Sequence, residues 1–191
     1  SAAIAARKAF RAAPALPRDW DVFVEIRAAT VEAESTDMSL PGDCPTLLAA
    51  AAEIEGAITA AGLDRVPGHN DGQASNILLG PAGQVLLVDF DCAGQSDPYY
   101  DLAALLNEAC LFEVDWRTGI AIHDGTCRDD VLNRCRVYGF ADDLLWGLRG
   151  LVLSHSSPRV GLEFLKYGEW RLLRARMALR ESGFRDRLHQ L

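Results

Sequence analysis

The sequence lacks several patterns, and each absence excludes a class of protein. Its five cysteines are Cys44, Cys92, Cys110, Cys127 and Cys135. The number is odd and no C-x-x-C pair occurs, which argues against a zinc site or a disulfide framework and favours a reducing cytoplasm. No apolar run approaches the roughly 20 residues that span a membrane. A protein that binds nucleic acid needs a cationic face, and a net charge of −8 does not suit one. We therefore expect neither a membrane nor a nucleic acid as a partner.

Apolar residues, in contrast, are abundant. They make up 49% of the 191 residues, enough for a sizeable core. This length fits one domain, or one large lobe of a two-lobe enzyme. The alanine-rich start of the chain contains Arg7, Lys8 and Arg11 within its apolar pattern. A secretory signal has an unbroken apolar stretch after its charges, so we predict a helix there instead.

Helical periodicity covers most of the chain and is interrupted by proline and glycine. The predicted helices are 2–12, 20–33, 46–62, 102–112, 127–140, 142–154 and 162–182. Thr46 is the predicted cap of the third helix and Gly62 its C-terminus. Residues 66–76 look loop-like, whereas two short apolar runs, 77–79 and 85–88, flank a Gly-Pro-Ala-Gly turn and predict a β-hairpin. The pattern predicts an α+β, mainly helical fold in which a small β-hairpin carries a site.

A basic run near the C-terminal end contains Arg171, Arg174 and Arg176 within a predicted helix. Long cationic side chains usually keep their charged groups in water. We therefore predict a solvated helix face here rather than a phosphate-binding site.

Two polar segments contain side chains suited to chemistry. They read His-Asn-Asp-Gly-Gln-Ala-Ser-Asn at 69–76 and Val-Asp-Phe-Asp at 88–91. The predicted hairpin lies between them, so it would bring Asn76 close to Asp89, with Asp71 nearby. Amide and carboxylate oxygens are ligands that Mg²⁺ takes alongside water and phosphates.

The spacing of these residues also matches an arrangement used for phosphoryl transfer. Protein kinases have an Asp and an Asn five residues apart in the catalytic loop, and a metal-binding Asp after it. Asp71 and Asn76 have that spacing, and Asp89 follows at a hairpin's distance. The reaction needs an aligned acceptor hydroxyl, a metal that bridges the phosphates, and charge neutralisation. The alternative is a polar turn and hairpin without a catalytic role.

Residues 69–76 resemble the H-x-D-x-x-x-x-N loop of aminoglycoside phosphotransferases and choline kinases, and residues 88–103 resemble their D-[FW]-E-Y-A-G-x-N-D-P-x-x-D-L-A segment. Gln73 and the Trp-Gly-Leu run at 146–148 are similar to the choline/ethanolamine kinase branch. The resemblance implies a protein-kinase-like C-terminal lobe that uses ATP and Mg²⁺ to phosphorylate the hydroxyl of a small alcohol or amino alcohol. An aminoglycoside-type phosphotransferase and a non-catalytic, pseudokinase-like binding module stay open as alternatives, as does a homodimer.

The resemblance also implies roles for the residues that match its catalytic motif. Asp71 would orient the acceptor hydroxyl and take its proton. Asn76 and Asp89 would bind Mg²⁺. Asp91 stands where the family usually has Glu, and it would assist a second metal or lie in the outer shell of the first.

Five further residues have expected roles around that motif. Gln73, Glu108 and Trp146 are expected to bind substrate, Glu108 as an acid that faces a cation and Trp146 through its ring. The alternatives are loop scaffolding for Gln73, a solvated helix face for Glu108 and core packing for Trp146. His69 and Asp101 are expected to support the catalytic loop, Asp101 from the start of the next helix, where the dipole favours a carboxylate.

Two positions depart from the branch, and both concern the substrate. Cys92 stands where tyrosine is usual, and Arg149 stands where some choline kinases have a second tryptophan. Both changes remove aromatic surface from an ammonium cage. They leave open a hydroxyl substrate other than choline.

The sequence shows no strand lysine of the kind that grips the ATP phosphates. Its only lysines, Lys8 and Lys166, lie outside any Val-Ala-x-Lys pattern, and no Gly-rich loop precedes the catalytic loop. We therefore expect residues 1–191 to form a single kinase-like C-terminal lobe, with the N-terminal lobe that covers the nucleotide absent from the chain. The isolated chain is expected to have little or no kinase activity.

Overall fold

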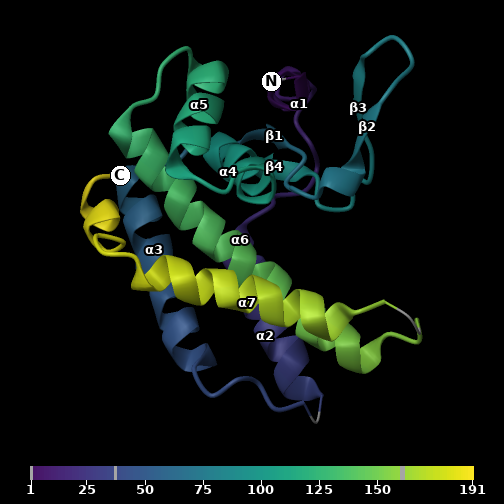
Figure 1. The fold of residues 1–191 in the computed structure, drawn as a ribbon, viewed down its shortest axis with the longest axis vertical. Coiled ribbons are helices and arrows are strands. Elements are labelled where there is room, and N and C mark those ends of the chain that lie inside the picture. The colour runs from purple at the N-terminus through teal and green to yellow at the C-terminus, as the bar shows by residue number, and fades with distance from the viewer. Residues whose placement is uncertain (1, 37, 160–161) are drawn as a thin grey trace. The chain divides into compact units, whose positions relative to one another are not determined.

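The computed structural model describes residues 2–36, 38–159 and 162–191, and this part of the chain is mainly helical with small antiparallel sheets (Figure 1). The helices are α1 (Ala2–Phe10), α2 (Val22–Ser35), α3 (Cys44–Ala61), α4 (Pro98–Ala109), α5 (Glu113–Asp124), α6 (Asp129–Ser156) and α7 (Phe164–Arg180), with short 3-10 helices η1 (Ala74–Asn76) and η2 (Asp186–His189). The strands are β1 (Val66–Gly68), β2 (Ile77–Leu79), β3 (Val85–Leu87) and β4 (Gly94–Ser96). The predicted α+β, mainly helical fold class is confirmed.

The chain divides into two compact units. The first comprises residues 1–20, 61–139 and 190–191, and it contains α1, α4, α5 and the strands. The second comprises residues 21–60 and 140–189, and it contains α2, α3 and α7. Helix α6 begins in the first unit and ends in the second. The first unit therefore contains most of the residues expected to carry chemistry.

The predicted hairpin is confirmed in the first unit. Strand β2 pairs with β3 in antiparallel register, from Ile77 opposite Leu87 to Leu79 opposite Val85. Gly83 has a φ of 77° and lies in the turn, in the left-handed region that glycine tolerates. The two polar segments are therefore joined by a short, regular connection.

A second small sheet corrects the prediction of a loop before the hairpin. Residues 66–68 form β1 and pair with β4, with Val66 opposite Ser96 and Gly68 opposite Gly94. A three-residue strand that contains proline and glycine has no alternating pattern, so only its distant partner reveals it. This pairing fixes the start of the segment 69–76, which we call the Asp71 loop.

Helix α4 begins earlier than predicted. Asp97 caps it, because its Oδ1 accepts the backbone N–H of Tyr99 at 2.8 Å, and Pro98 occupies the first position. Asp101 therefore lies within the first turn and not at the start of the helix, which corrects that prediction. Its carboxylate is still near the N-terminal end, where the helix dipole favours negative charge.

Two further helix predictions are wrong. Helix α5 lies where no helix was predicted, and it ends at Gly125, whose φ is 84°. Residues 127–140 and 142–154, predicted as two helices, belong mostly to the single helix α6. Ala141 at the expected junction is a strong helix former and is fully buried, so nothing breaks the helix there.

Helix α3 begins at Cys44, so the predicted cap Thr46 lies inside the helix. The predicted end is correct, because Gly62 follows the last helical residue with a φ of 78°. A glycine there ends the helix without the steric cost that a Cβ atom would bring.

Within the second unit, α6 and α7 cross where their backbones touch. A Cβ atom on Gly150 would lie 2.7 Å from the Cα of Gly168, whereas a Cβ atom on Gly147 would lie 2.6 Å from the side-chain Cδ2 of Leu172 and 3.2 Å from its backbone nitrogen. Only a residue without a side chain permits this approach. The glycine of the Trp-Gly-Leu run therefore has a packing role in this crossing.

The basic run on α7 is not a uniformly solvated face. Arg171 is 2% exposed, and it pairs with Asp142 and, at 2.9 Å, with Asp143. Arg176 pairs with Asp43 on both of its guanidinium nitrogens, at 2.6 and 2.7 Å. The prediction was wrong because acidic partners distant in the chain neutralise these charges.

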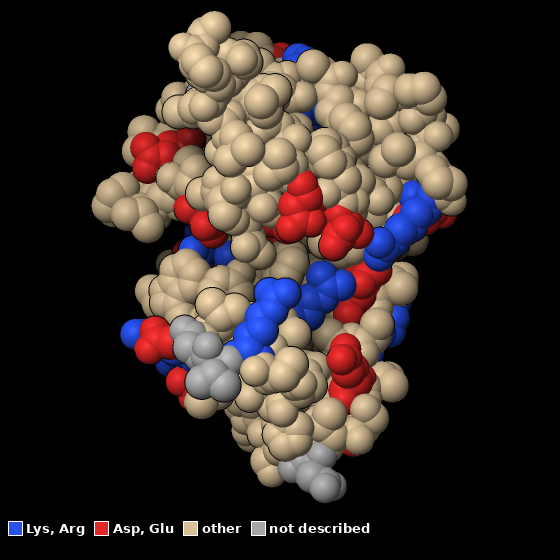
Figure 2. Space-filling view, turned by 90° about the vertical axis from the view of Figure 1, so that its right-hand side faces the viewer, with Lys and Arg blue, Asp and Glu red and all other residues tan. Residues whose placement is uncertain are grey.

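The face of the molecule shown in Figure 2 carries charged side chains of both signs. On the face drawn in Figure 2, Lys and Arg side chains lie among Asp and Glu side chains. Among the described residues, no helix is both long enough and apolar enough to cross a membrane.

Candidate active site

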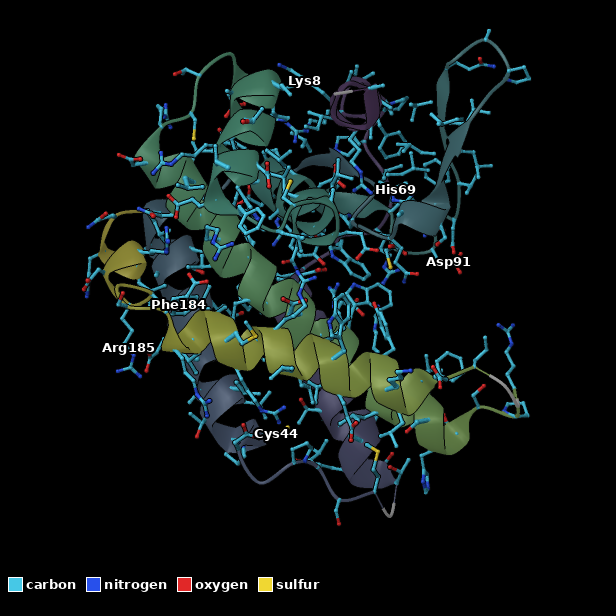
Figure 3. All side chains as sticks on the ribbon, in the orientation of Figure 1. Lys8, Cys44, His69, Asp91, Phe184 and Arg185 are labelled. Carbon is cyan, nitrogen blue, oxygen red and sulfur yellow. The ribbon has the colours of Figure 1, made fainter. Side chains whose placement is uncertain are left out.

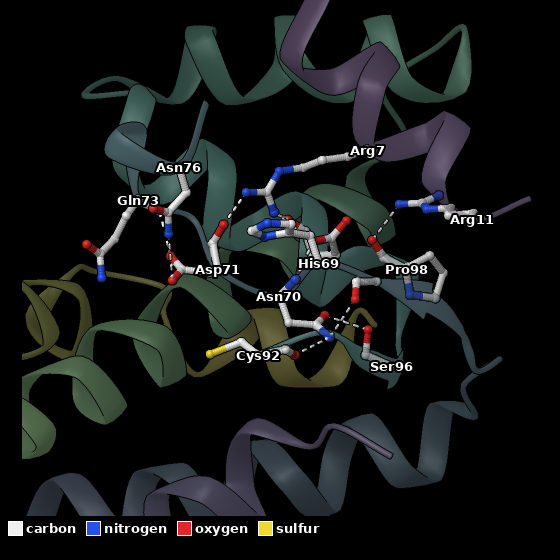
Figure 4. Close-up of polar contacts among 12 residues, drawn as sticks. Arg7, Arg11, His69, Asn70, Asp71, Gln73, Asn76, Cys92, Ser96 and Pro98 are labelled. Carbon is white, nitrogen blue, oxygen red and sulfur yellow. Dashed lines mark hydrogen bonds and ion pairs between the residues drawn. The ribbon is translucent and has the colours of Figure 1, made fainter. Parts of the chain in front are cut away.

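Asp71 is the centre of the candidate site and is 5% exposed. Its Oδ1 accepts the backbone N–H of Gln73 at 2.8 Å, and its Oδ2 accepts the side-chain amide of Asn76 at 3.0 Å (Figure 4). A carboxylate can only accept, so the NH₂ group of Asn76 must face it, and the amide oxygen lies on the other side. Two residues predicted to act together are thus in contact.

The hairpin returns the chain to Asn76 just before Asp89. The backbone N–H of Val88 donates to the carbonyl of Asn76 at 3.1 Å, one pair beyond the regular register of the sheet. Asp89 follows with a φ of 63°, a left-handed conformation that turns the chain out of the strand. Non-glycine residues in this region concentrate at functional sites.

The side chains of Asp89 and Asp91 are exposed to solvent. The backbone carbonyl of Asp91 accepts a hydrogen bond from Arg18 at 2.8 Å. Figure 3 labels Asp91 and His69, both of which belong to the first unit. Exposure leaves the carboxylates of Asp89 and Asp91 accessible to a soluble ligand.

His69 links the Asp71 loop to the chain that leads to Asp89. It is fully buried, and its Nε2 donates to the carbonyl of Val88 at 2.9 Å. Its ring meets Phe90 edge-on, with centroids 4.9 Å apart. A histidine held in this way constrains backbone on both sides of the hairpin.

Asn70 makes several hydrogen bonds that connect distant segments, and the sequence alone assigns it no role. It is fully buried with a φ of 64°, and its backbone N–H donates to Asp101 Oδ1 at 2.8 Å. Its side chain donates to the carbonyl of Cys92 at 3.1 Å and accepts from Ser96 Oγ at 2.6 Å. Asparagine tolerates the left-handed region better than most residues, which is the signal that was available.

Asp101 approaches the Asp71 loop from α4, and Arg7 approaches it from α1. Asp101 is fully buried, and its Oδ1 accepts from Arg7 Nη1 at 2.7 Å. Arg7 is 2% exposed, and its Nη2 donates to the backbone carbonyl of Asp71 (Figure 4). The sequence marked Arg7 only as part of a helical pattern, because nothing local reveals a partner 94 residues away.

Glycine at position 72 lets the Asp71 loop lie directly on α4. A Cβ atom there would be 2.1 Å from the carbonyl oxygen of Ala104. Glu108 follows Ala104 by one helical turn, on the same side of α4, and is exposed. Gln73 is half-buried beside Asp71. The two predicted substrate residues Gln73 and Glu108 thus belong to the same unit as Asp71.

Trp146 belongs to the second unit, where Arg149 lies over its ring at 5.1 Å from the centroid. Arg149 also pairs with Glu25 at 2.6 Å. One ring face that could hold an ammonium group therefore carries a guanidinium. The substrate role of Trp146 stays a prediction.

The oxygen-bearing side chains suit a hard divalent cation. Among the described residues, no group of three or more His, Cys, Asp or Glu side chains forms a metal-binding cluster. The predicted set instead combines the amide oxygen of Asn76 with the exposed carboxylates of Asp89 and Asp91. Mg²⁺ commonly binds through one or two carboxylates together with water and substrate phosphates, so this donor set fits it.

Comparisons with known proteins identify a family and a fold for this chain. Residues 3–137 match the phosphotransferase enzyme family. No curated protein sequence matches the chain. Solved structures of other proteins are also similar to this chain.

A choline/ethanolamine kinase family protein from Mesorhizobium loti has a TM-score of 0.87 at 22% identity, over 99% of this chain and 64% of that one. The choline kinase LicA from Streptococcus pneumoniae has a TM-score of 0.79 at 21% identity, over 92% and 61%. Aminoglycoside 2'-phosphotransferase-IIIa has a TM-score of 0.56 at 17% identity, over 83% and 52%. The chain shares the fold of these proteins and spans less than two-thirds of the length of each.

Proposed function

Because the chain belongs to the phosphotransferase enzyme family, we propose that it carries the catalytic loop of an ATP-dependent kinase that acts on a small-molecule hydroxyl. The observation that carries the proposal is the buried carboxylate of Asp71, fixed by the N–H of Gln73 and the amide of Asn76. Phosphoryl transfer needs little covalent chemistry and depends on a positioned base and charge stabilisation. A carboxylate held by two hydrogen bonds meets the first need.

Asp71 would accept a hydrogen bond from the acceptor hydroxyl and take its proton as the phosphoryl group is transferred. Asn76 and Asp89 would hold Mg²⁺, and Asp91 would lie in its outer shell. When bound, the ion neutralises charge on the nucleotide phosphates. His69 and Asp101 would keep the Asp71 loop in place through Val88 and Asn70.

We propose an amino alcohol with a primary ammonium group, such as ethanolamine, as a better acceptor than choline. A quaternary ammonium binds over aromatic faces, yet Arg149 covers one face of Trp146 and Cys92 replaces an aromatic residue. A primary ammonium instead donates hydrogen bonds to carboxylates. The exposed carboxylate of Glu108, one turn beyond the contact between α4 and the Asp71 loop, would be its partner.

Each of the two lysines of the chain has a partner outside the Asp71 loop. Lys8 donates to the carbonyl of His123 at 2.6 Å, and Lys166 pairs with Glu163 at 3.0 Å. Neither belongs to a strand. We therefore propose that residues 1–191 alone turn over ATP slowly, below the roughly 1 s⁻¹ of an ordinary kinase.

Calorimetric titration with Mg²⁺·ADP tests the nucleotide site. We expect the wild-type chain to bind, and Asp89→Ala to weaken binding about 10-fold or more, as the loss of a charged ligand implies. Asp64→Ala removes an exposed carboxylate of the same unit outside the site, and it should leave binding unchanged. Equal binding by wild type and Asp89→Ala would reject the proposed metal site.

A panel of acceptors tests the substrate. Ethanolamine, choline and aminoglycosides are incubated with Mg²⁺·ATP, and phosphorylated products are separated and quantified. The proposal expects ethanolamine ahead of choline, and Glu108→Gln should reduce the preference for ethanolamine. Phosphorylation of aminoglycosides alone would move the chain to the alternative substrate class. Nucleotide binding without any product would favour a non-catalytic binding module.

A further inference from the structure

We propose that Arg7 is a positioning residue for the Asp71 loop. Its effect on catalysis rests on the proposed kinase function of that loop. Arg7 lies on α1, and its guanidinium joins three groups that are distant in sequence. Nη1 donates to the carboxylate of Asp101 at 2.7 Å and to its backbone carbonyl at 3.3 Å, while Nη2 donates to the carbonyl of Asp71. One side chain thus ties α1 to both α4 and the loop.

The planar fork of arginine is what makes this double contact possible. A guanidinium presents five N–H donors in fixed directions, whereas a lysine ammonium is a point charge on a flexible stem. Lysine at position 7 could still neutralise Asp101. It could not hold Asp101 and the carbonyl of Asp71 together in the same way. Loss of the fork and loss of the charge are therefore separable.

Both ends of Asp71 are fixed in this arrangement. Arg7 holds its backbone carbonyl, while the N–H of Gln73 and the amide of Asn76 hold its carboxylate. Gly72, pressed against the backbone of Ala104, limits movement toward α4. The carboxylate that would meet the acceptor hydroxyl can therefore keep its direction only while the backbone behind it stays in place.

The energetics of the pair also favour a geometric role. Arg7 and Asp101 have side chains 2% and 1% exposed. Arg7 Nε and Asp101 Oδ2 are buried without a hydrogen-bond partner among the described residues. A buried ion pair with unsatisfied atoms seldom stabilises a fold more than an apolar pair of the same size. What the apolar pair could not provide is the contact with the carbonyl of Asp71.

A matched pair of variants tests the proposal. Arg7→Lys keeps the charge and removes the fork. Arg11→Lys makes the same chemical change one residue after α1, where the side chain donates to the carbonyl of Pro98 at 2.7 Å and not to the Asp71 loop. Amide hydrogen exchange, followed by NMR, measures the protection of the Gln73 N–H and so the rigidity of the Asp71 loop. Thermal unfolding measures the stability of the fold.

We expect Arg7→Lys to lower the exchange protection of the Gln73 amide on the order of 10-fold, the loss that one charge-assisted hydrogen bond implies. Arg11→Lys should leave that amide protected. Unchanged protection of Gln73 in a folded Arg7→Lys chain would overturn the proposal, as would an equal loss in Arg11→Lys. If the chain turns over ATP, Arg7→Lys should lower kcat about 10-fold, with KM for Mg²⁺·ATP within twofold of wild type.

Should Arg7→Lys not fold, native-state hydrogen exchange of the wild-type chain decides the matter. The Gln73 amide should open together with the amides of α1, because Arg7 couples them. Independent opening would overturn the proposal. Calorimetry with Mg²⁺·ADP remains a separate test of the phosphotransferase: a wild-type chain that binds no nucleotide would reject that function, and the exchange data would still judge Arg7.

Discussion

The two compact units each bury an arginine, and the two arginines do different things. Arg7 and Arg171 are both 2% exposed. Arg7 on α1 contacts the carboxylate and backbone carbonyl of Asp101 on α4, and also the backbone carbonyl of Asp71 in the irregular Asp71 loop. Arg171 pairs with the side chains of two aspartates on the neighbouring helix α6. Contacts with backbone orient a loop, whereas contacts between side chains of regular helices hold the helices together.

The largest expected effect is on the stability of the second unit. Arg171→Met would remove the partner that Asp142 and Asp143, 2% and 3% exposed, share, although Asp143 would keep its pair with Arg174 at 3.2 Å. Burial lowers the pKa of Arg171, but these two carboxylates raise it by more, so the guanidinium stays charged. We expect the free energy of unfolding to fall by about 3–5 kcal/mol.

Urea unfolding measures that loss, and exchange at the Gln73 amide serves as the control. We expect Arg171→Met to destabilise the chain without selectively loosening the Asp71 loop. A loss of less than about 1 kcal/mol would show that the pairing of Arg171 with Asp142 and Asp143 does not hold α7 and α6 together.

The next effect concerns the helix crossing of the second unit. In Gly150→Ala, the new Cβ would meet the Cα of Gly168 at 2.7 Å, backbone that cannot move aside cheaply. We expect a loss of about 1–3 kcal/mol, measured by urea unfolding. Gly56→Ala on α3 is the matched control, since nothing lies within 4 Å of its Cβ. Gly56→Ala should raise the free energy of unfolding by about 0.5–1 kcal/mol. A similar loss of stability in both variants would contradict the role of Gly150 in the close approach of α6 and α7.

The first unit differs in backbone conformation as well. Among the described residues, the non-glycine residues with positive φ are Asn70 and Asp89, both in this unit. Asp89→Gly should raise the free energy of unfolding by up to about 1 kcal/mol, because glycine adopts a φ of 63° without strain. The same variant should lose Mg²⁺·ADP binding.

Asp91→Gly provides the contrast, since Asp91 lacks a positive φ and glycine there only adds entropy to the unfolded chain. Chemical denaturation of the two variants in parallel would separate strain from charge. If Asp89→Gly were as destabilised as Asp91→Gly, strain at position 89 would play no part.

The smallest expected effect is a pH dependence in the first unit. His123 on α5 is 3% exposed; burial lowers its pKa, Arg11 and Lys8 lower it further, and Asp124 opposes them. As the pH falls, His123 in the unfolded chain, with a pKa of about 6.5, therefore binds a proton before His123 in the folded chain does. Stability should be intact above that pH and decline as the pH falls toward the lower folded pKa.

Thermal melts of wild type and His123→Asn between pH 7 and pH 5 would detect this slope. The variant should show a shallower decline with falling pH. An identical decline in both proteins would assign the acid sensitivity to groups other than His123.

Much of the candidate site could be predicted from the sequence because its geometry is local. Asp71 and Asn76 lie within one short loop, and a regular hairpin returns the chain beside Asn76 just before Asp89. Spacing and turn chemistry contain that information. The sequence does not predict strand β1 or helix α5, and it divides α6 into two helices, since short or weakly periodic segments depend on partners elsewhere in the chain.

The residues that hold the loop were the ones least visible in advance. Asn70 was noted only as the middle of a motif, and Arg7 only as a charge in a helix. Each is defined by contacts with Asp101 or with backbone carbonyls brought close by packing. No local pattern distinguishes a buried arginine from a solvated one, as the wrong prediction for Arg171 also shows.

The helical character of the chain, the hairpin and the residue types of a phosphotransferase loop follow from the order of the amino acids, because propensity, turn chemistry and short spacings act over a few residues. The burial of particular charges, the carbonyls that they contact and the place where two helices touch at glycine depend on how the chain folds. Those outcomes depend on desolvation and close packing between segments far apart in the chain, and no short stretch of sequence contains both partners.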